Sequence, residues 1–348
     1  MRVLITGNLG YVGSVLVGSL RRALPQAELI GFDAGWFSGD LTQSGPLPET
    51  QLDVQYFGDV RAIPANLLSG CDAVVHLAAI SNDPMGNRFA AVTEDINHAA
   101  SVTLATAARD AGVGVFVFAS SCSVYGAAAG PPRREGDPLN PQTAYARSKI
   151  ATERSLAEMD RGGMRAICLR FATACGWSPR LRLDLVLNDF CACALSSGEI
   201  SILSDGTPWR PLIDVRDMAR AIHWAIGTGQ TLPGHITLNV GSNCGNVQVR
   251  DLAVAVAAAV PGTRIEVNTD AAPDTRSYQV DFSRFAALAH DFAPQVDLAA
   301  SIAGLVAGLR AIGFSDRAFR GSALIRLRVL ERLMEIGTVD DRLRAVAA

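Results

Sequence analysis

The chain has 348 residues, of which 49% are hydrophobic and 19% charged, and its formal net charge is −3. This balance is that of a globular protein with a sizeable core, and the mixed charges indicate neither a nucleic-acid surface nor a polybasic membrane patch. The longest apolar runs are too short to span a bilayer, and the N-terminus leads straight into a strand pattern without a signal-peptide layout.

The first half of the sequence alternates strand and helix patterns. Short, almost continuous apolar runs predict buried strands, and the segments between them have helical spacing. This alternation predicts an α/β fold with a Rossmann-type doubly wound parallel sheet. The predicted strands are 2–6, 28–33, 72–78, 114–120 and 165–171, and the predicted helices are 11–22, 99–111 and 145–159.

After Gly176 the composition changes, and proline, glycine and aromatic residues become denser. The predicted helices there are 185–196, 215–226 and 252–260, with strands 199–203 and 264–267; residues 317–344 also have helical spacing, as in a solvated capping helix or a subunit contact. We predict a Rossmann domain over 1–175 to which 213–242 return, a smaller, discontinuous α/β substrate-binding lobe over 176–212 and 243–315, and a helical extension over 316–348.

The seven cysteines and five histidines have no metal-binding spacing, since neither Cys-x-x-Cys nor His-x-x-x-His occurs. An odd number of cysteines without such spacing argues against both a disulfide framework and a zinc site. We therefore predict no metal, mostly buried thiols and a reducing, cytoplasmic location.

A glycine-rich turn follows the first predicted strand. Gly7, Gly10 and Gly13 are spaced G-x-x-G-x-x-G and open the helix predicted over 11–22. Such glycines allow a tight turn and let backbone N–H groups approach a pyrophosphate at the helix N-terminus. The turn therefore predicts a dinucleotide site.

Asp33 indicates which dinucleotide is bound. It ends the next predicted strand, twenty residues after Gly13, and no arginine stands in 31–35. A carboxylate at this place binds the ribose hydroxyls of NAD and repels the 2′-phosphate of NADP. We therefore predict NAD as the cofactor, with Asp59 and Val60 beside the adenine.

Lys149 is the only lysine of the chain, and Tyr145 precedes it by four residues. On a helix these two side chains share one face. An ammonium beside a phenol favours the phenolate and would lower the pKa of Tyr145 from about 10. Tyr145 is therefore a candidate general acid/base. The alternative is a surface pair on an amphipathic helix, because Tyr-x-x-x-Lys alone is a weak pattern.

Together the motifs resemble those of the extended short-chain dehydrogenase/reductase family, which contains nucleotide-sugar epimerases and dehydratases. The resemblance extends over nearly the whole chain. The matching residues are Gly7, Gly10 and Gly13, His-Leu-Ala-Ala at 76–79, Asn97, Ser-Ser-Cys-Ser-Val-Tyr-Gly at 120–126, Tyr145 with Lys149, Asn-Val-Gly at 239–241, and Arg210.

The resemblance implies that Ser121, Tyr145 and Lys149 are catalytic. Ser121 lies at the carboxyl end of a buried strand, where open α/β sheets bind their ligands, and Ser120 and Ser123 are the alternatives. The implied NAD contacts are Gly7, Asn8, Leu9, Gly10, Tyr11, Val12, Gly13, Asp33, Asp59, Val60, Leu77, Ala78, Ala79, Asn97, Ser120, Tyr145, Lys149 and Phe171. The implied substrate contacts are Ser81, Ser121, Cys122, Ser123, Tyr145, Thr173, Arg180, Arg182, Asn188, Arg210 and Arg276.

Several of these positions leave alternatives open. Arginine suits bidentate phosphate binding, but each of the four arginines could instead form an ordinary salt bridge. Dehydratases of the family carry Asp-Glu after the catalytic hydroxyl, where this chain has Cys122 and Ser123. Cys122 is either a proton donor or acceptor or a buried, inert thiol. Thr173 replaces the usual asparagine.

We therefore predict NAD-dependent epimerisation of a nucleotide-activated sugar through a transient keto intermediate. A nucleotide-sugar ketoreductase, dehydrogenase or dehydratase is the alternative enzyme. A non-catalytic dinucleotide-binding protein is a further alternative, which the presence of Ser121, Tyr145 and Lys149 disfavours. The expected partners are the nucleotide sugar and a second copy of the chain in a homodimer, with no nucleic acid and no membrane.

Overall fold

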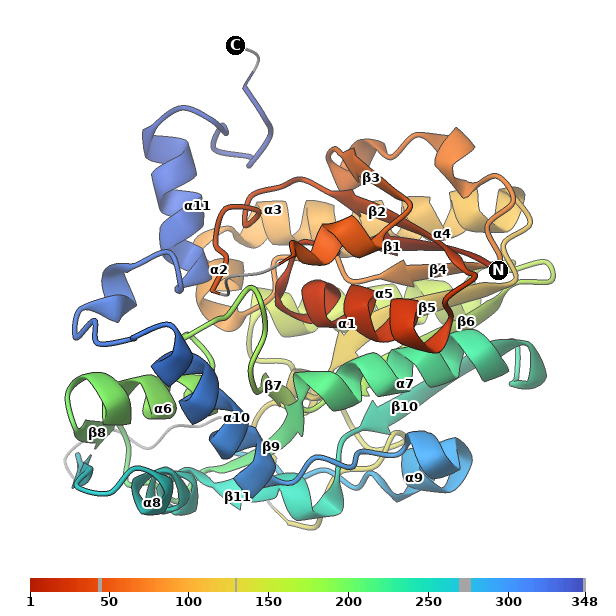
Figure 1. Ribbon diagram of the computed structural model, residues 1–348. Helices are drawn as coiled ribbons and strands as arrows, with labels where there is room; N and C mark the ends of the chain where they lie inside the picture. The colour runs from red at the N-terminus through yellow and green to blue at the C-terminus, as the bar shows by residue number, and fades with distance from the viewer. Residues whose placement is uncertain (43–45, 129, 269–276, 347–348) are drawn as a thin grey trace.

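The computed structural model describes residues 1–42, 46–128, 130–268 and 277–346. Its centre is a seven-stranded sheet in the order β10-β6-β5-β4-β1-β2-β3, and every neighbouring pair is parallel (Figure 1). The prediction of a doubly wound parallel sheet is confirmed. The strands are β1 (Arg2–Thr6), β2 (Glu28–Asp33), β3 (Val54–Phe57), β4 (Ala73–His76), β5 (Val115–Ser121), β6 (Arg165–Phe171) and β10 (His235–Val240).

Helices cover both faces of this sheet. Val3 and Ile5 of β1 pack in one core with Leu16 of α1, and Leu4 packs in a second core with Leu104 of α4. This alternation follows from the two-residue period of a strand, and burial of both faces explains the continuous apolar runs. The helices around the sheet are α1 (Tyr11–Ala23), α2 (Asp83–Arg88), α3 (Ala90–Glu94), α4 (Ala100–Asp110), α5 (Ala144–Glu158), α7 (Val215–Thr228) and α9 (Ser283–Ala289).

A third core lies among α6, α8 and α10, which pack beside two small sheets. One sheet has the order β11-β9-β7, and the other pairs β12 with β8. The bounds of the two predicted lobes stay a prediction. The elements are α6 (Val186–Ser196), α8 (Val249–Ala259), α10 (Leu298–Ala311), β7 (Thr173–Cys175), β8 (Glu199–Ile202), β9 (Trp209–Asp214), β11 (Asn246–Gln248) and β12 (Arg264–Val267).

The end of the chain returns to the large sheet domain. The helix α11 (Arg326–Glu335) is shorter than the helical spacing of 317–344 suggests and lies near α2 (Figure 1). Leu330, Val339 and Leu343 are buried in the same core as Leu4. Within the described ranges, no helix combines the length and the apolar character needed to cross a membrane.

Candidate functional site

A pocket of about 530 Å³ lies at the carboxyl ends of the central strands. Gly7, Asp33, Ala78, Ser121 and Phe171 line it, and each ends or follows one of the strands β1, β2, β4, β5 and β6. The strand order reverses between β1 and β4, which is where doubly wound sheets bind nucleotides. The topology therefore brings the predicted motifs to one place.

The glycine turn is shaped for a close approach. Gly7 has φ +76°, and a Cβ added to it would lie 2.6 Å from the backbone N of Ala78. A Cβ on Gly13 would lie 2.5 Å from the carbonyl oxygen of Gly7. Tyr11 and Val12, in the first turn of α1, also line the pocket. Because the first amides of a helix have no intrahelical acceptor, this turn fits a pyrophosphate.

Asp33 is held in a fixed orientation beside this turn. Its carboxylate accepts hydrogen bonds from the backbone N of Leu9 at 3.0 Å and of Gly35 at 2.8 Å, and it lines the pocket. Asp59 lines the pocket as well, and the Nε of Arg61 binds its carboxylate at 2.9 Å. The arrangement fits a ribose at Asp33, as the sequence predicts.

Ser121, Tyr145 and Lys149 meet in the pocket. The Ser121 hydroxyl accepts the backbone N–H of Ser123 at 3.1 Å, and its polar contact with Tyr145 acts to lower the pKa of that phenol. The Nζ of Lys149 donates to the carbonyl oxygen of Ala119 at 2.7 Å and lies 5.5 Å from the ring centre of Tyr145. The helix α5 positions both residues, because four residues make about one turn.

The alternatives to Ser121 have other surroundings. The hydroxyl of Ser120 donates to the buried carboxylate of Glu153 at 2.5 Å. Ser123 lines the pocket, and its buried hydroxyl has no hydrogen-bond partner among the residues described. Of these three serines, it is the Ser121 hydroxyl that acts on the pKa of Tyr145. The geometry therefore favours Ser121 as the catalytic hydroxyl.

The prediction that Lys149 lowers the pKa of Tyr145 is wrong for the protein alone. Burial raises the pKa of Tyr145 to about 12, although the polar contact with Ser121 acts in the opposite direction. Burial also lowers the pKa of Lys149 to about 7, so its ammonium is only partly charged at neutral pH. Since an opposite charge favours the phenolate, a further positive charge in the pocket would lower the pKa of Tyr145.

A buried polar network lies below Lys149. Glu153, on the next turn of α5, pairs with Arg170 of β6 at 2.6 Å, and both side chains are about 6% exposed. Arg170 also donates to the hydroxyl of Tyr125 at 3.0 Å. The negative charge of Glu153 acts against the lowering of the Lys149 pKa. This network ties α5 to β5 and β6, and so supports Ser121, Tyr145 and Lys149.

Some of the predicted contacts support the pocket from behind. Cys122 is fully buried in the core, its thiol donates to the carbonyl oxygen of Arg170 at 3.1 Å, and burial raises its pKa. Asn97 binds both the N–H and the C=O of Ile80, at 2.8 and 2.9 Å. These residues therefore act on the pocket through the backbone that they hold.

Three more of the predicted contact residues, Asn8, Leu9 and Asn188, also hold the backbone or side chains around the pocket. The amide oxygen of Asn188 accepts the backbone N–H of Gly176 at 3.1 Å, and its Nδ2 donates to the carbonyl oxygen of Arg182 at 2.8 Å. The side chain of Asn8 donates to that of Gln55 at 2.6 Å, and the backbone N–H of Leu9 donates to the carboxylate of Asp33. Asn8, Leu9 and Asn188 thus serve as structural supports.

The predicted arginines divide into two groups. Arg180 is 0% exposed and forms an ion pair with Glu49 at 3.0 Å, so it corresponds to the salt-bridge alternative and not to a phosphate contact. Arg182 and Arg210 line the pocket with Ser81 and Thr173. Arg276 lies outside the described residues.

Arg182 reaches the pocket as part of a short polar chain. Its guanidinium binds Asp184 at 2.9 Å and the hydroxyl of Ser81 at 3.0 Å. Asn82 donates to the same carboxylate at 2.6 Å. The charge of Arg182 is thereby balanced, and its position beside Ser81 is fixed.

The pocket also has residues that sequence reasoning missed. Trp36, Phe37, Asp83, Tyr278 and Arg326 line it, although they belong to no motif. Asp83 accepts a hydrogen bond from Thr143 at 2.7 Å, and its charge acts to raise the pKa of Tyr145. Residues so far apart in the chain carry no common spacing, so no local signal could have placed them together.

Comparison with known proteins gives a consistent result. The chain is 26% identical over 323 residues to a dTDP-glucose 4,6-dehydratase of Actinoplanes sp., covering 89% of this chain and 98% of the relative. It is 30% identical over 251 residues to an uncharacterised UDP-glucose epimerase, YtcB, of Bacillus subtilis, covering 69% and 77%. The structure of MoeE5 with UDP-glucuronic acid and NAD matches with TM-score 0.75 and 28% identity, covering 89% of this chain and 99% of MoeE5.

The family model agrees with the site. The model of the NAD dependent epimerase/dehydratase family matches residues 3–241, which contain the glycine turn, Ser121, Tyr145 and Lys149. The resemblance predicted from the motifs is confirmed, and so is NAD as the cofactor. The chain therefore belongs to the NAD-dependent epimerase/dehydratase family, a family of enzymes.

Proposed function

We propose that the protein epimerises a nucleotide-activated sugar through a transient keto intermediate, with Ser121, Tyr145 and Lys149 as its catalytic residues. The observation that carries this proposal is the meeting of Ser121, Tyr145 and Lys149 in the pocket that also holds the glycine turn and Asp33. The names of the relatives and of MoeE5 support a nucleotide sugar as the substrate.

In the proposed reaction, Tyr145 as phenolate takes the proton of a sugar hydroxyl while Ser121 donates a hydrogen bond to the same oxygen. The glycine turn, Asp33 and Lys149 would hold NAD in the pocket, where it would supply the hydride acceptor and donor for the carbon of that hydroxyl, and its oxidised form would bring a positive charge. That charge favours the phenolate, which is disfavoured in the protein alone. Tyr145 finally gives the proton back to the sugar oxygen.

The substrate contacts proposed are Ser81, Ser123, Thr173, Arg182 and Arg210, because these residues line the pocket. Ser123 offers a hydroxyl without a partner among the described residues, which a sugar hydroxyl can satisfy. Arginine is suited to the pyrophosphate of a nucleotide sugar. We also propose a cytoplasmic homodimer; seven free thiols support the reducing compartment.

A panel of UDP- and dTDP-sugars, incubated with the enzyme in deuterium oxide, tests the function. We expect by NMR and mass spectrometry a product of the same mass as its substrate, inverted at one carbon and without solvent deuterium, because the hydride returns to the carbon that lost it. Added NAD should not be consumed. Loss of water, net reduction of NAD, or no conversion of any sugar would contradict the proposal.

Cys122→Ala should leave turnover within about tenfold of the wild type, because an essential acid/base group contributes about a hundredfold or more. The thiol is buried in the core, and burial raises its pKa, so it is a poor proton donor or acceptor. Steady-state turnover with the sugar that the panel identifies measures this effect. Turnover of Thr173→Ala, a substitution at a residue that lines the pocket, is measured beside it for comparison. Inactivity of Cys122→Ala together with incorporation of deuterium at the carbon beside the oxidised one would show that Cys122 acts as a base.

Loss of water from the sugar that requires Asp83 would indicate a dehydratase.

NAD should bind at least tenfold more tightly than NADP, which corresponds to about 1.4 kcal/mol. Asp33 accepts two backbone N–H bonds and keeps acceptor capacity for ribose hydroxyls, while its charge repels a 2′-phosphate. Calorimetric titration of each cofactor measures the difference in affinity. Asp33→Asn should reduce this difference between NAD and NADP. Equal affinity of the wild type for both cofactors would rule out this role of Asp33.

A further inference from the structure

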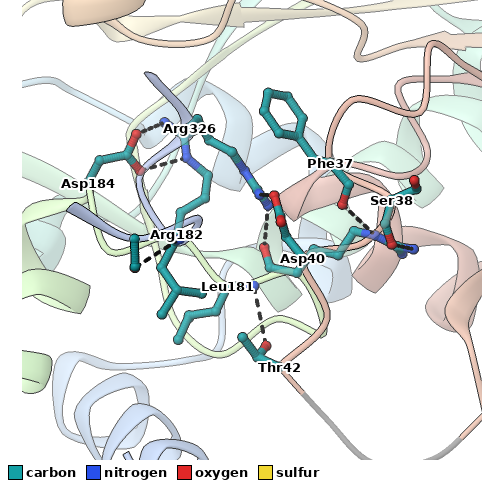
Figure 2. A network of polar contacts seen from close by, with 12 residues as sticks. Phe37, Ser38, Asp40, Thr42, Leu181, Arg182, Asp184 and Arg326 are labelled. Atoms are coloured by element: carbon teal, nitrogen blue, oxygen red, sulfur yellow. Dashed lines mark hydrogen bonds and ion pairs between the residues drawn. The ribbon is translucent and has the colours of Figure 1, made fainter. Parts of the chain in front are cut away.

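The C-terminal extension, residues 316–346, contributes a side chain to the pocket. Arg326, the first residue of α11, is 1% exposed and lines the pocket. Its guanidinium donates to the carboxylate of Asp40 at 2.8 Å and to the carbonyl oxygen of Arg180 at 3.0 Å, and it lies 4.4 Å from the ring centre of Phe37 (Figure 2). One side chain thus joins three segments that are distant in the sequence.

The segment that Arg326 holds is the wall beside Asp33. Phe37 and Asp40 follow β2 by a few residues, and Phe37 itself lines the pocket. Arg180 donates to the carbonyl oxygens of Phe37 at 3.3 Å and Ser38 at 3.1 Å. The hydroxyl of Thr42 donates to the carbonyl oxygen of Pro179 at 3.0 Å. This wall is therefore held by hydrogen bonds to segments from elsewhere, and it contains no helix or strand of its own over 38–42.

The extension contacts the pocket at a second place. Arg61, whose Nε binds the pocket residue Asp59 at 2.9 Å, also donates to the carbonyl oxygens of Arg342 at 2.8 Å and Leu343 at 2.9 Å. Val339 and Leu343 are buried in the core that contains Phe32 and Val60. The extension thus supports two pocket-lining segments besides Asp33, one with Phe37 and one with Asp59.

The charges here indicate a role in positioning. Arg180 pairs with Glu49, Arg182 with Asp184 and Arg326 with Asp40, so each buried guanidinium has a carboxylate partner. Such pairs add little net charge for a ligand, but loss of one partner leaves a buried charge uncompensated and releases the segment that it held. The family model, which ends at residue 241, does not include the extension.

We infer that the C-terminal extension completes the NAD site next to Asp33, and that Arg326 is the positioning residue through which it slows NAD release. The inference rests on NAD binding in this pocket and not on the proposed sugar chemistry. It places a determinant of cofactor affinity about three hundred residues beyond the glycine turn.

Arg326→Met tests this inference, because methionine keeps an apolar stem and removes the guanidinium. We expect the Kd for NAD to rise at least about tenfold, with most of the change in the dissociation rate. Arg328→Met is the matched control on the same helix, since Arg328 is half exposed and its ion pair with Glu331, at 2.8 Å, lies within α11. Calorimetry gives Kd and stopped-flow displacement of NAD gives the rate, both without any sugar. Unchanged NAD binding in Arg326→Met would overturn the inference.

A double variant separates positioning from a loss of stability. Arg326→Met with Asp40→Asn removes the uncompensated carboxylate, so the melting temperature should recover while NAD affinity stays low. Recovery of NAD affinity together with the melting temperature would show that the unpaired charge, and not the lost connection, weakened binding, and would overturn the inference. If Arg326→Met does not fold, Arg326→Lys serves instead. It keeps a partner for Asp40 but loses the fork that also reaches Arg180, and it should bind NAD at least about threefold more weakly; unchanged binding would again contradict the inference.

Discussion

Tyr145→Phe should lower turnover by about three orders of magnitude, within the range for loss of a general acid/base. The substitution removes one oxygen atom and leaves the ring that lies 5.5 Å from the Nζ of Lys149, so packing of α5 and binding of NAD should be unchanged. Turnover with the sugar identified in the panel gives the effect, and calorimetric titration with NAD is the control. Turnover within about tenfold of the wild type would exclude Tyr145 as the acid/base.

The pH dependence of turnover, compared between the wild type and Tyr145→Phe, is a second test. In the protein alone the pKa of Tyr145 is about 12, and the positive charge of bound NAD should lower it. Because the phenolate is the active form, wild-type turnover should rise with pH through the ionisation of Tyr145 in the complex. Tyr145→Phe should lack this rise. A rise that persists in the variant would assign the ionisation to another group.

Lys149→Arg should lower turnover by about a hundredfold although the charge is kept. Lys149 is 3% exposed, and its ammonium donates to the carbonyl oxygen of Ala119 at 2.7 Å and lies 4.7 Å from the ring centre of Phe118. A planar guanidinium is wider and must displace these neighbours, which costs about 1–3 kcal/mol of stability as well. Turnover and the free energy of unfolding, measured side by side, give both effects. Near-normal turnover would contradict a special role for the only lysine.

Lys149→Met separates the effect of the Lys149 charge on stability and turnover from the effect of its side-chain shape. The pKa of Lys149 is about 7 in the folded protein and about 10.5 in the unfolded chain. Burial of the ammonium therefore lowers the free energy of unfolding by its full amount below pH 7. This cost falls as the pH rises from 7 and disappears above about 10.5. Lys149→Met should therefore be more stable than the wild type at pH 6, with a smaller difference at pH 9, while its turnover stays low. A difference that grows with pH would contradict the lowered pKa.

Local sequence patterns predicted the parts of the site that depend on local geometry. The strands 2–6, 28–33 and 165–171 have the predicted bounds, because continuous apolar runs between helices signal a buried parallel sheet. The glycine turn follows from the strand before it and the helix after it. The pairing of Tyr145 with Lys149 needs only one turn of a helix.

Other features depend on packing between distant segments, and the sequence does not encode them locally. Helix α10 was not predicted, and α11 is shorter than its spacing suggests, because burial against other elements decides where such helices begin and end. The pKa of Tyr145 moves opposite to the prediction, because the sequence shows a neighbouring lysine but not the burial that dominates.

The sequence alone determined the fold class and the cofactor, since both rest on short spacings within one strand, turn or helix, and it predicted Tyr145 and Lys149 as a pair for the same reason. Only the tertiary structure decided that Cys122 is in the core, that Arg180 is an internal ion pair, and that Arg326 reaches the pocket from the C-terminus. The physical reason is that burial and ion pairing are properties of the packed chain, set by elements that meet only after folding.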